Sequence, residues 1–140
     1  MTQEDKELLL KDLCARLPYH THTKVWLKDG TTEEGALDLE HNYGDVLRDA
    51  FYYNKIVKIK PYLFPLSSMT KEQLFEVQEI LGKNEIEIDD GFLRIVDSDR
   101  NVITYLEILA VLEWFYKNHF DVNNLIPKGL AIDATGLNIY

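Results

Sequence analysis

Apolar positions near the start of the chain recur with the period of an α-helix. The apolar stripe consists of Leu9, Leu10, Leu13, Cys14 and Leu17. Thr2 is a favourable N-cap, and Pro18 ends the pattern because proline does not continue a helix. The pattern predicts a helix from about Thr2 to Leu17. Because Cys14 lies within the stripe, we expect a buried packing thiol rather than a catalytic nucleophile.

Residues 20–60 are instead rich in strand-forming residues. Four candidate strands are Thr21–Leu27, Thr32–Glu40, residues 46–53 and Lys55–Tyr62. Asp29-Gly30 marks a tight turn after the first strand, because this dipeptide supplies positive φ angles. We predict an antiparallel meander of about four strands. Lys58 and Lys60 alternate with apolar residues, which favours a solvated strand face over a phosphate-binding stripe.

After a proline-rich joint at residues 61–69, the helical period returns. Thr70 and Gln73 form a capping box, which predicts a helix over residues 70–81 that Gly82 ends. Isoleucine and glutamate then alternate with period two around Asp90-Gly91, which predicts a second hairpin over residues 85–96.

A long apolar helix is predicted to follow, from a second capping box at Thr104 and Glu107 to about Asn118. Its main stripe is Tyr105, Ile108, Leu109, Leu112, Phe115 and Tyr116, and Leu106, Ala110, Val111 and Trp114 extend the apolar surface to the sides. A helix that is apolar on most sides is usually buried on several sides.

These elements predict one α+β domain over residues 1–140. A small antiparallel sheet, the meander plus the second hairpin, is packed by the N-terminal helix and the long C-terminal helix. Residues 1–60 hold the first helix and the meander, residues 61–69 the joint, and residues 70–140 the remaining elements.

Composition narrows the function classes. The 140 residues carry a formal charge of -9, with 13 acids and 6 bases in residues 69–140. Direct nucleic-acid binding is therefore not expected, because it depends on lysine and arginine neutralising phosphates. A single cysteine excludes an internal disulfide, the charged N-terminus does not resemble a secretory signal, and no uncharged run is long enough to span a bilayer. We expect a cytoplasmic protein without membrane contact.

Candidate metal ligands are sparse. Asp97, Asp99, Asn101 and Glu107 resemble the calcium loop of an EF-hand. The glycine expected after Asn101 is missing, which favours a solvated turn. His20 and His22 would share one strand face, but a metal site needs further ligands. We find no catalytic motif and predict no cofactor.

Aromatic and polar side chains at the joint and at the exit of the long helix are the candidates for protein contacts, because such side chains anchor interfaces. They are Tyr62, Phe64, Trp114, His119, Phe120, Asp121 and Lys128. The pair of greatest interest is Trp114 with Tyr62. The same aromatic residues are also typical of a core.

Three stretches carry a family resemblance. They are M-T-Q-E-D-K-E-L-L-L-K-D-L-C-A-R-L-P-Y at the start, K-P-Y-L-F-P-L-S-S-M-T at the joint and N-H-F-D-V-N-N-L-I-P-K-G-L-A-I at the exit. Together they resemble a family of short uncharacterised proteins from gut Bacteroidales and their phages or prophages. That family usually has Tyr-Arg-Gly where this chain has Val122-Asn123-Asn124. The resemblance implies a bacterial or phage cytoplasm and an accessory role.

The leading functional prediction is a non-enzymatic protein-interaction protein whose partner is another protein; the sequence leaves the oligomeric state open. One alternative is an acidic inhibitor that mimics nucleic acid, with the acids of residues 85–99 on one exposed face. A second alternative is a small enzyme or ligand-binding protein with a cleft near His20, His22 and His119.

Overall fold

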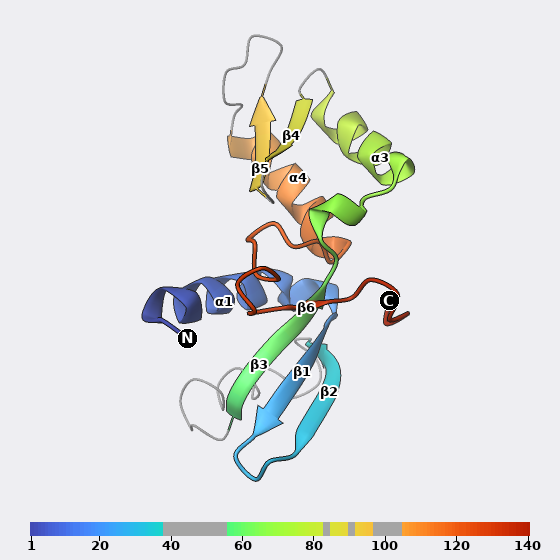
Figure 1. Ribbon diagram of the computed structural model, residues 1–140. Helices are drawn as coiled ribbons and strands as arrows, with labels where there is room; N and C mark the ends of the chain where they lie inside the picture. The colour runs from blue at the N-terminus through green and yellow to red at the C-terminus, as the bar shows by residue number, and fades with distance from the viewer. Residues whose placement is uncertain (38–55, 83–84, 90–91, 97–104) are drawn as a thin grey trace. The chain divides into compact units, whose positions relative to one another are not determined.

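The computed structural model describes residues 1–37, 56–82, 85–89, 92–96 and 105–140 (Figure 1). It confirms the α+β class, with helices and a four-stranded mixed sheet. The chain divides into two compact units. Unit 1 contains Met1–Leu63 and Leu125–Tyr140, and unit 2 contains Phe64–Asn124. The first boundary falls within the predicted joint.

Unit 1 is built around a sheet with the strand order β2-β1-β3-β6. The strands are β1 (Thr21–Leu27), β2 (Thr32–Leu37), β3 (Ile56–Leu63) and β6 (Ile132–Asp133). The predicted all-antiparallel meander is wrong in two respects. β1 lies between β2 and β3, and β6 pairs with β3 in parallel. A parallel partner must come from a distant segment, so hairpin signals do not reveal it. The predicted strand at residues 46–53 lies outside the described residues.

Helix α1 (Gln3–Arg16) covers the sheet's buried side chains from the same unit. Its predicted cap is confirmed, since Thr2 and Asp5 form a capping box, and the short helix η1 (Leu17–Tyr19) follows. The prediction for Cys14 is wrong, because its thiol is exposed. The buried face contains Leu9, Asp12, Leu13 and Arg16. Asp12 and Arg16 form an ion pair on this face, and Cys14 lies outside the face. Hydrophobic periodicity alone does not anticipate buried charges.

The core of unit 1 joins α1, the sheet and the C-terminal segment. Its buried residues are Leu9, Leu13, Val25, Leu37, Ile59, Leu63, Leu125, Leu130 and Ala131. Leu125 and Leu130 are brought together by a tight turn. The N–H of Leu130 donates to the carbonyl of Leu125 at 2.9 Å, and Gly129 adopts the required positive φ of 70°.

Unit 2 contains η3 (Leu66–Ser68), α3 (Lys71–Leu81), the antiparallel pair β4 (Glu85–Asp89) and β5 (Phe92–Val96), and α4 (Tyr105–Lys117). The predicted cap of α3 is confirmed by hydrogen bonds in both directions between Thr70 and Gln73. The core of unit 2 consists of Leu66, Val77, Leu81, Val111, Phe115 and Phe120. On α4 the predicted stripe is confirmed at Phe115, which is buried, but it is wrong at Leu109, which is 37% exposed, and Val111, predicted to lie at its side, is buried. An all-round apolar helix offers no pattern that selects one face.

The exit of α4 is a Schellman-type ending. The N–H of Phe120 donates to the carbonyl of Phe115 at 2.9 Å, and that of His119 donates to Tyr116 at 3.1 Å. His119 takes the left-handed conformation, with φ at 63°. The rings of Phe115 and Phe120 meet edge to face at 5.9 Å. This apolar contact across the turn stabilises the chain where it leaves α4.

Candidate functional site

Polar and aromatic side chains converge on one face of the unit 1 sheet. We call this set the sheet face: His22, Lys24, Trp26, Glu34, Lys58, Lys60 and Tyr62. Strand register explains the set, because Lys24 is opposite both Glu34 and Lys60, and Trp26 is opposite Lys58. Alternate residues such as Val25 and Ile59 are buried in the core on the other side.

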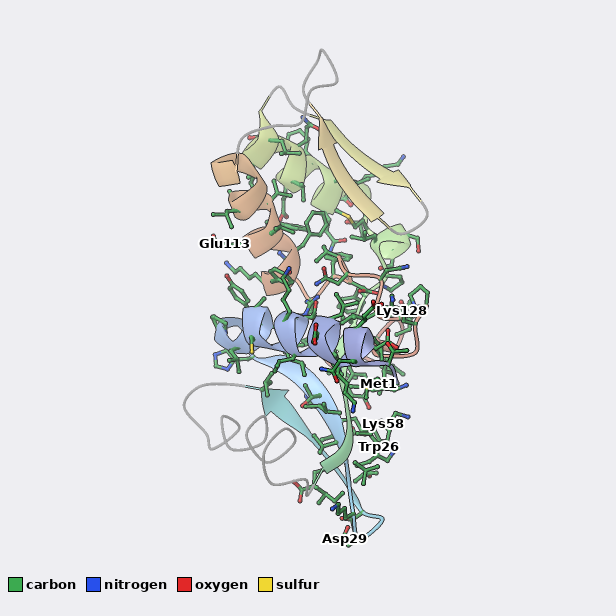
Figure 2. All side chains as sticks on the ribbon, turned by 90° about the vertical axis from the view of Figure 1, so that its left-hand side faces the viewer. Met1, Trp26, Asp29, Lys58, Glu113 and Lys128 are labelled. Carbon is green, nitrogen blue, oxygen red and sulfur yellow. The ribbon has the colours of Figure 1, made fainter. Side chains whose placement is uncertain are left out.

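Trp26 lies between two lysines of the sheet face. The Nζ atom of Lys58 is 4.8 Å from the centroid of the Trp26 ring, and that of Lys24 is 5.7 Å away. Figure 2 labels Trp26 and Lys58 beside each other on this sheet. Both separations are within the range of cation–π attraction. The two contacts place both ammonium groups beside the aromatic ring.

Lys24 also belongs to a hydrogen-bonded group with Glu34 and Tyr62. Its Nζ lies 2.7 Å from Glu34 Oε1, and the Tyr62 hydroxyl donates to the same oxygen at 3.1 Å. The pKa of Glu34 is lowered, first by the hydrogen bond from Lys24 and then by that from Tyr62. The pKa of Lys24 is raised by the same contact with Glu34. Both groups therefore stay ionised over a wide pH range, and much of the Lys24 charge is neutralised.

Lys58 and Lys60 carry the remaining positive charge of the sheet face. Lys58 is exposed and Lys60 is half-buried. The pKa of Lys60 is lowered, first by its partial burial and then by the positive charge of Lys58. An incoming anion would relieve this repulsion. Among the described residues of the sheet face, three lysines against one glutamate give a positive local charge, on a chain with a formal charge of -9.

The sheet face continues to Tyr62 and His22 at the other end of β1. Their ring centroids are 5.5 Å apart. Tyr62 is only 6% exposed, so it packs beneath its neighbours on the sheet face and offers little surface to a ligand. His20 lies one residue before β1 in the left-handed conformation, with φ at 52°. The strand periodicity that predicted a shared face for His20 and His22 therefore does not apply.

Lys128, a predicted interaction residue, lies in the turn from Leu125 to Leu130 of unit 1. It is exposed and forms a 3.6 Å ion pair with Asp5. The pKa of Asp5 is lowered chiefly by its hydrogen bonds with Thr2, and Lys128 adds a smaller effect. Lys128 thus connects the C-terminal segment to the first turn of α1.

The remaining predicted interaction residues belong to unit 2. Phe120 and Asp121 are buried, and Phe64, Trp114 and His119 are half-buried. The rings of Trp114 and Phe120 stack at 5.8 Å. Backbone bonds join Phe64 to His119 and Asp121, each at 2.9 Å. These contacts give the aromatic residues a packing role, and their role in binding stays a prediction. The proposed pair is divided, because Tyr62 belongs to unit 1 and Trp114 to unit 2.

The candidate calcium ligands Asp97, Asp99 and Asn101 lie outside the described residues, as does the side chain of Glu107. Within the described ranges, no group of three or more histidine, cysteine, aspartate or glutamate side chains could hold a metal ion. The acids of residues 85–99 also lie among side chains that the structure does not describe.

Sequence reasoning missed Lys24 and Trp26 as site residues. A signal was present, because His22, Lys24 and Trp26 alternate with Thr21, Thr23 and Val25 along one strand. Period-two alternation places the first set on a single face. The partner strands that bring Glu34, Lys58 and Lys60 to the same face follow only from the register.

The chain matches no protein-family model, no curated protein and no solved structure. The resemblance to the Bacteroidales and phage family therefore stays a prediction. Among the residues that the structure describes, no helix combines the length and apolar character needed to cross a membrane.

Proposed function

We propose that this chain is a non-enzymatic protein-interaction module whose sheet face binds an acidic segment of a partner protein. The observation that carries the proposal is Trp26 lying beside the ammonium groups of Lys58 and Lys24. An aromatic ring offers contact area to an apolar side chain, and the adjacent lysines attract carboxylates. Tryptophan is also among the residues most often found at interface hot spots.

Charge favours a protein segment over nucleic acid. A nucleic acid carries a phosphate at every nucleotide, and its affinity depends on several cations acting together. Here Glu34 already pairs with Lys24, which leaves Lys58 and Lys60 as the main cations on the face. The net charge of -9 opposes a long polyanion. A short segment with a few carboxylates and an apolar residue fits this limited charge better.

A fluorescence titration tests the proposal. The full chain with Trp114→Phe retains Trp26 as its single tryptophan, because the sequence has two. We expect a synthetic peptide of glutamate and leucine to change the Trp26 emission saturably, and a lysine–leucine peptide to leave it unchanged. Lys58→Glu with Lys60→Glu should weaken binding by at least about tenfold, which corresponds to about 1.4 kcal/mol.

Lys6→Glu with Lys11→Glu is the matched control, because it makes the same charge change at exposed lysines of α1. If this control weakens binding equally, only net charge matters and the sheet face is not the site. A single-stranded oligonucleotide of equal charge forms the second arm. Tighter binding of the oligonucleotide than of the acidic peptide would overturn the protein-partner proposal.

The accessory role in a bacterial or phage cytoplasm, which the resemblance implies, is part of the same proposal. Fractionation of the native host tests it, and recovery of the chain in a membrane or secreted fraction would contradict it. The finer fold prediction, one domain completed by a long C-terminal helix and a second hairpin, also stays a proposal. Backbone NMR assignment of these segments tests it.

A further inference from the structure

An acidic and aromatic stripe runs along α3 of unit 2. Glu72, Phe75 and Glu79 are spaced by three and four residues, so they share one side of the helix. This side is opposite to the buried Val77 and Leu81. Phe75 is 65% exposed, and both glutamates are exposed. We call these three residues the α3 stripe.

The α3 stripe matches the sheet face in chemistry. On each surface a large aromatic ring, Trp26 on the sheet face and Phe75 on the α3 stripe, has charges beside it, and the charges have opposite signs. Glu72 and Glu79 are separated by about 10 Å along the helix axis, from a rise of 1.5 Å per residue. Lys58 and Lys60 are separated by about 6.6 Å along the strand. Long lysine and glutamate side chains can span the difference.

We propose that the α3 stripe of one molecule docks on the sheet face of a second copy of this chain. The proposal rests on the proposed function, because it assigns the acidic segment for the same face. Charge selects this pairing over the symmetric ones. Two α3 stripes would bring four carboxylates together, and two sheet faces would bring their lysines together.

The assembly is predicted to be head to tail. Each molecule carries both surfaces, so a contact between two molecules leaves one of each surface available and further copies can add. Exposed ion pairs contribute little individually, so the association is weak. It also depends on salt, because the Debye length falls from about 10 Å at 0.1 M to about 3 Å at 1 M.

Sedimentation velocity of the full chain tests the assembly. At about 0.05 M NaCl the average mass should rise with protein concentration, and at about 0.5 M the association should weaken at least tenfold. Lys58→Gln with Lys60→Gln removes the charge of one surface, and Glu72→Gln with Glu79→Gln removes that of the other. Each double variant alone should be monomeric.

Mixing the two variants gives the decisive result. The lysine variant keeps its α3 stripe and the glutamate variant keeps its sheet face, so one intact contact can form. The mixture should reach a dimer and stop there. Lys6→Gln with Lys11→Gln and Glu4→Gln with Glu7→Gln, at exposed positions of α1, are controls that should associate like the wild type.

A wild-type chain that stays monomeric at low salt, or a mixture that does not associate, would overturn the self-docking proposal. The peptide titration with Trp26 separates this failure from that of the proposed function. A monomeric chain that still binds the acidic peptide retains its sheet face as a binding site. A chain that fails in both experiments refutes both proposals.

Discussion

The hydroxyl group of Tyr140 donates a 2.7 Å hydrogen bond to the backbone carbonyl of Tyr62. It also accepts one from the N–H of His22 at 2.9 Å. The pairing of β1 with β3 ends nearby, at Thr23 opposite Pro61, and proline has no N–H to donate. A side chain from the C-terminal segment thus replaces a ladder contact beside the sheet face.

Tyr140→Phe is expected to destabilise unit 1 by about 1 kcal/mol, because it removes both hydrogen bonds of the hydroxyl group, to Tyr62 and from His22. Urea unfolding followed by Trp26 fluorescence in the Trp114→Phe background measures the change. Tyr19→Phe makes the same chemical change in η1, outside this bridge. An equal loss in both variants would show that the bridge between the strands is not stabilising.

The same bridge predicts a pH dependence. The pKa of Tyr140 is raised to about 12, first by burial, while the backbone hydrogen bond from His22 acts in the opposite direction. The folded state therefore holds the phenolic proton more tightly than the unfolded state. The stabilisation that this proton contributes to the folded state is complete below the pKa of an unfolded tyrosine, near 10. It is lost as the pH rises toward 12. The free energy of unfolding should fall more steeply over this range in the wild type than in Tyr140→Phe.

Local sequence signals predicted several helix caps and strands correctly, because their interactions span only a few residues. The N-cap at Thr2 and the capping box at Thr70 are examples. Long-range choices were not predictable in the same way. The parallel partner β6 comes from a distant segment, and only the register places Lys58 opposite Trp26. Cys14 was misplaced because Asp12 and Arg16 occupy the buried side of α1.

The buried pair on α1 gives a second stability test. Arg16 Nε donates to Asp12 Oδ2 at 2.6 Å, and both side chains are fully buried. Asp12→Ala leaves a buried guanidinium without this carboxylate, so we expect a loss of about 3–5 kcal/mol. Urea unfolding with Trp26 as the reporter measures it.

Asp12→Leu combined with Arg16→Met removes both charges together. It should destabilise unit 1 less than Asp12→Ala, because no buried charge loses its partner. A double variant that loses more than the single variant would show that the pair's other contacts dominate.

Truncation of two phenylalanines of unit 2 should change its stability by very different amounts. Phe120 is 1% exposed and contacts three aromatic rings, so Phe120→Ala should cost about 3–5 kcal/mol. Phe75 is 65% exposed, so Phe75→Ala should change stability by less than about 0.5 kcal/mol. Unfolding followed by Trp114 fluorescence in a Trp26→Phe background compares them. A large loss in Phe75→Ala would indicate a structural role and weaken the assignment of the α3 stripe.

The turn from Leu125 to Leu130 allows a test of backbone conformation without a steric clash. Gly129 has a φ of 70°, and a Cβ added there meets no atom within 4 Å. Gly129→Ala should therefore destabilise unit 1 by about 1 kcal/mol, the cost of a left-handed L-residue. Urea unfolding with the Trp26 reporter measures the loss. Lys128→Ala, at the adjacent exposed position, should lose less, because its ion pair with Asp5 is exposed to solvent. If Gly129→Ala leaves the free energy of unfolding unchanged, the turn can relax. The burial of Leu125 and Leu130 would then not depend on this conformation.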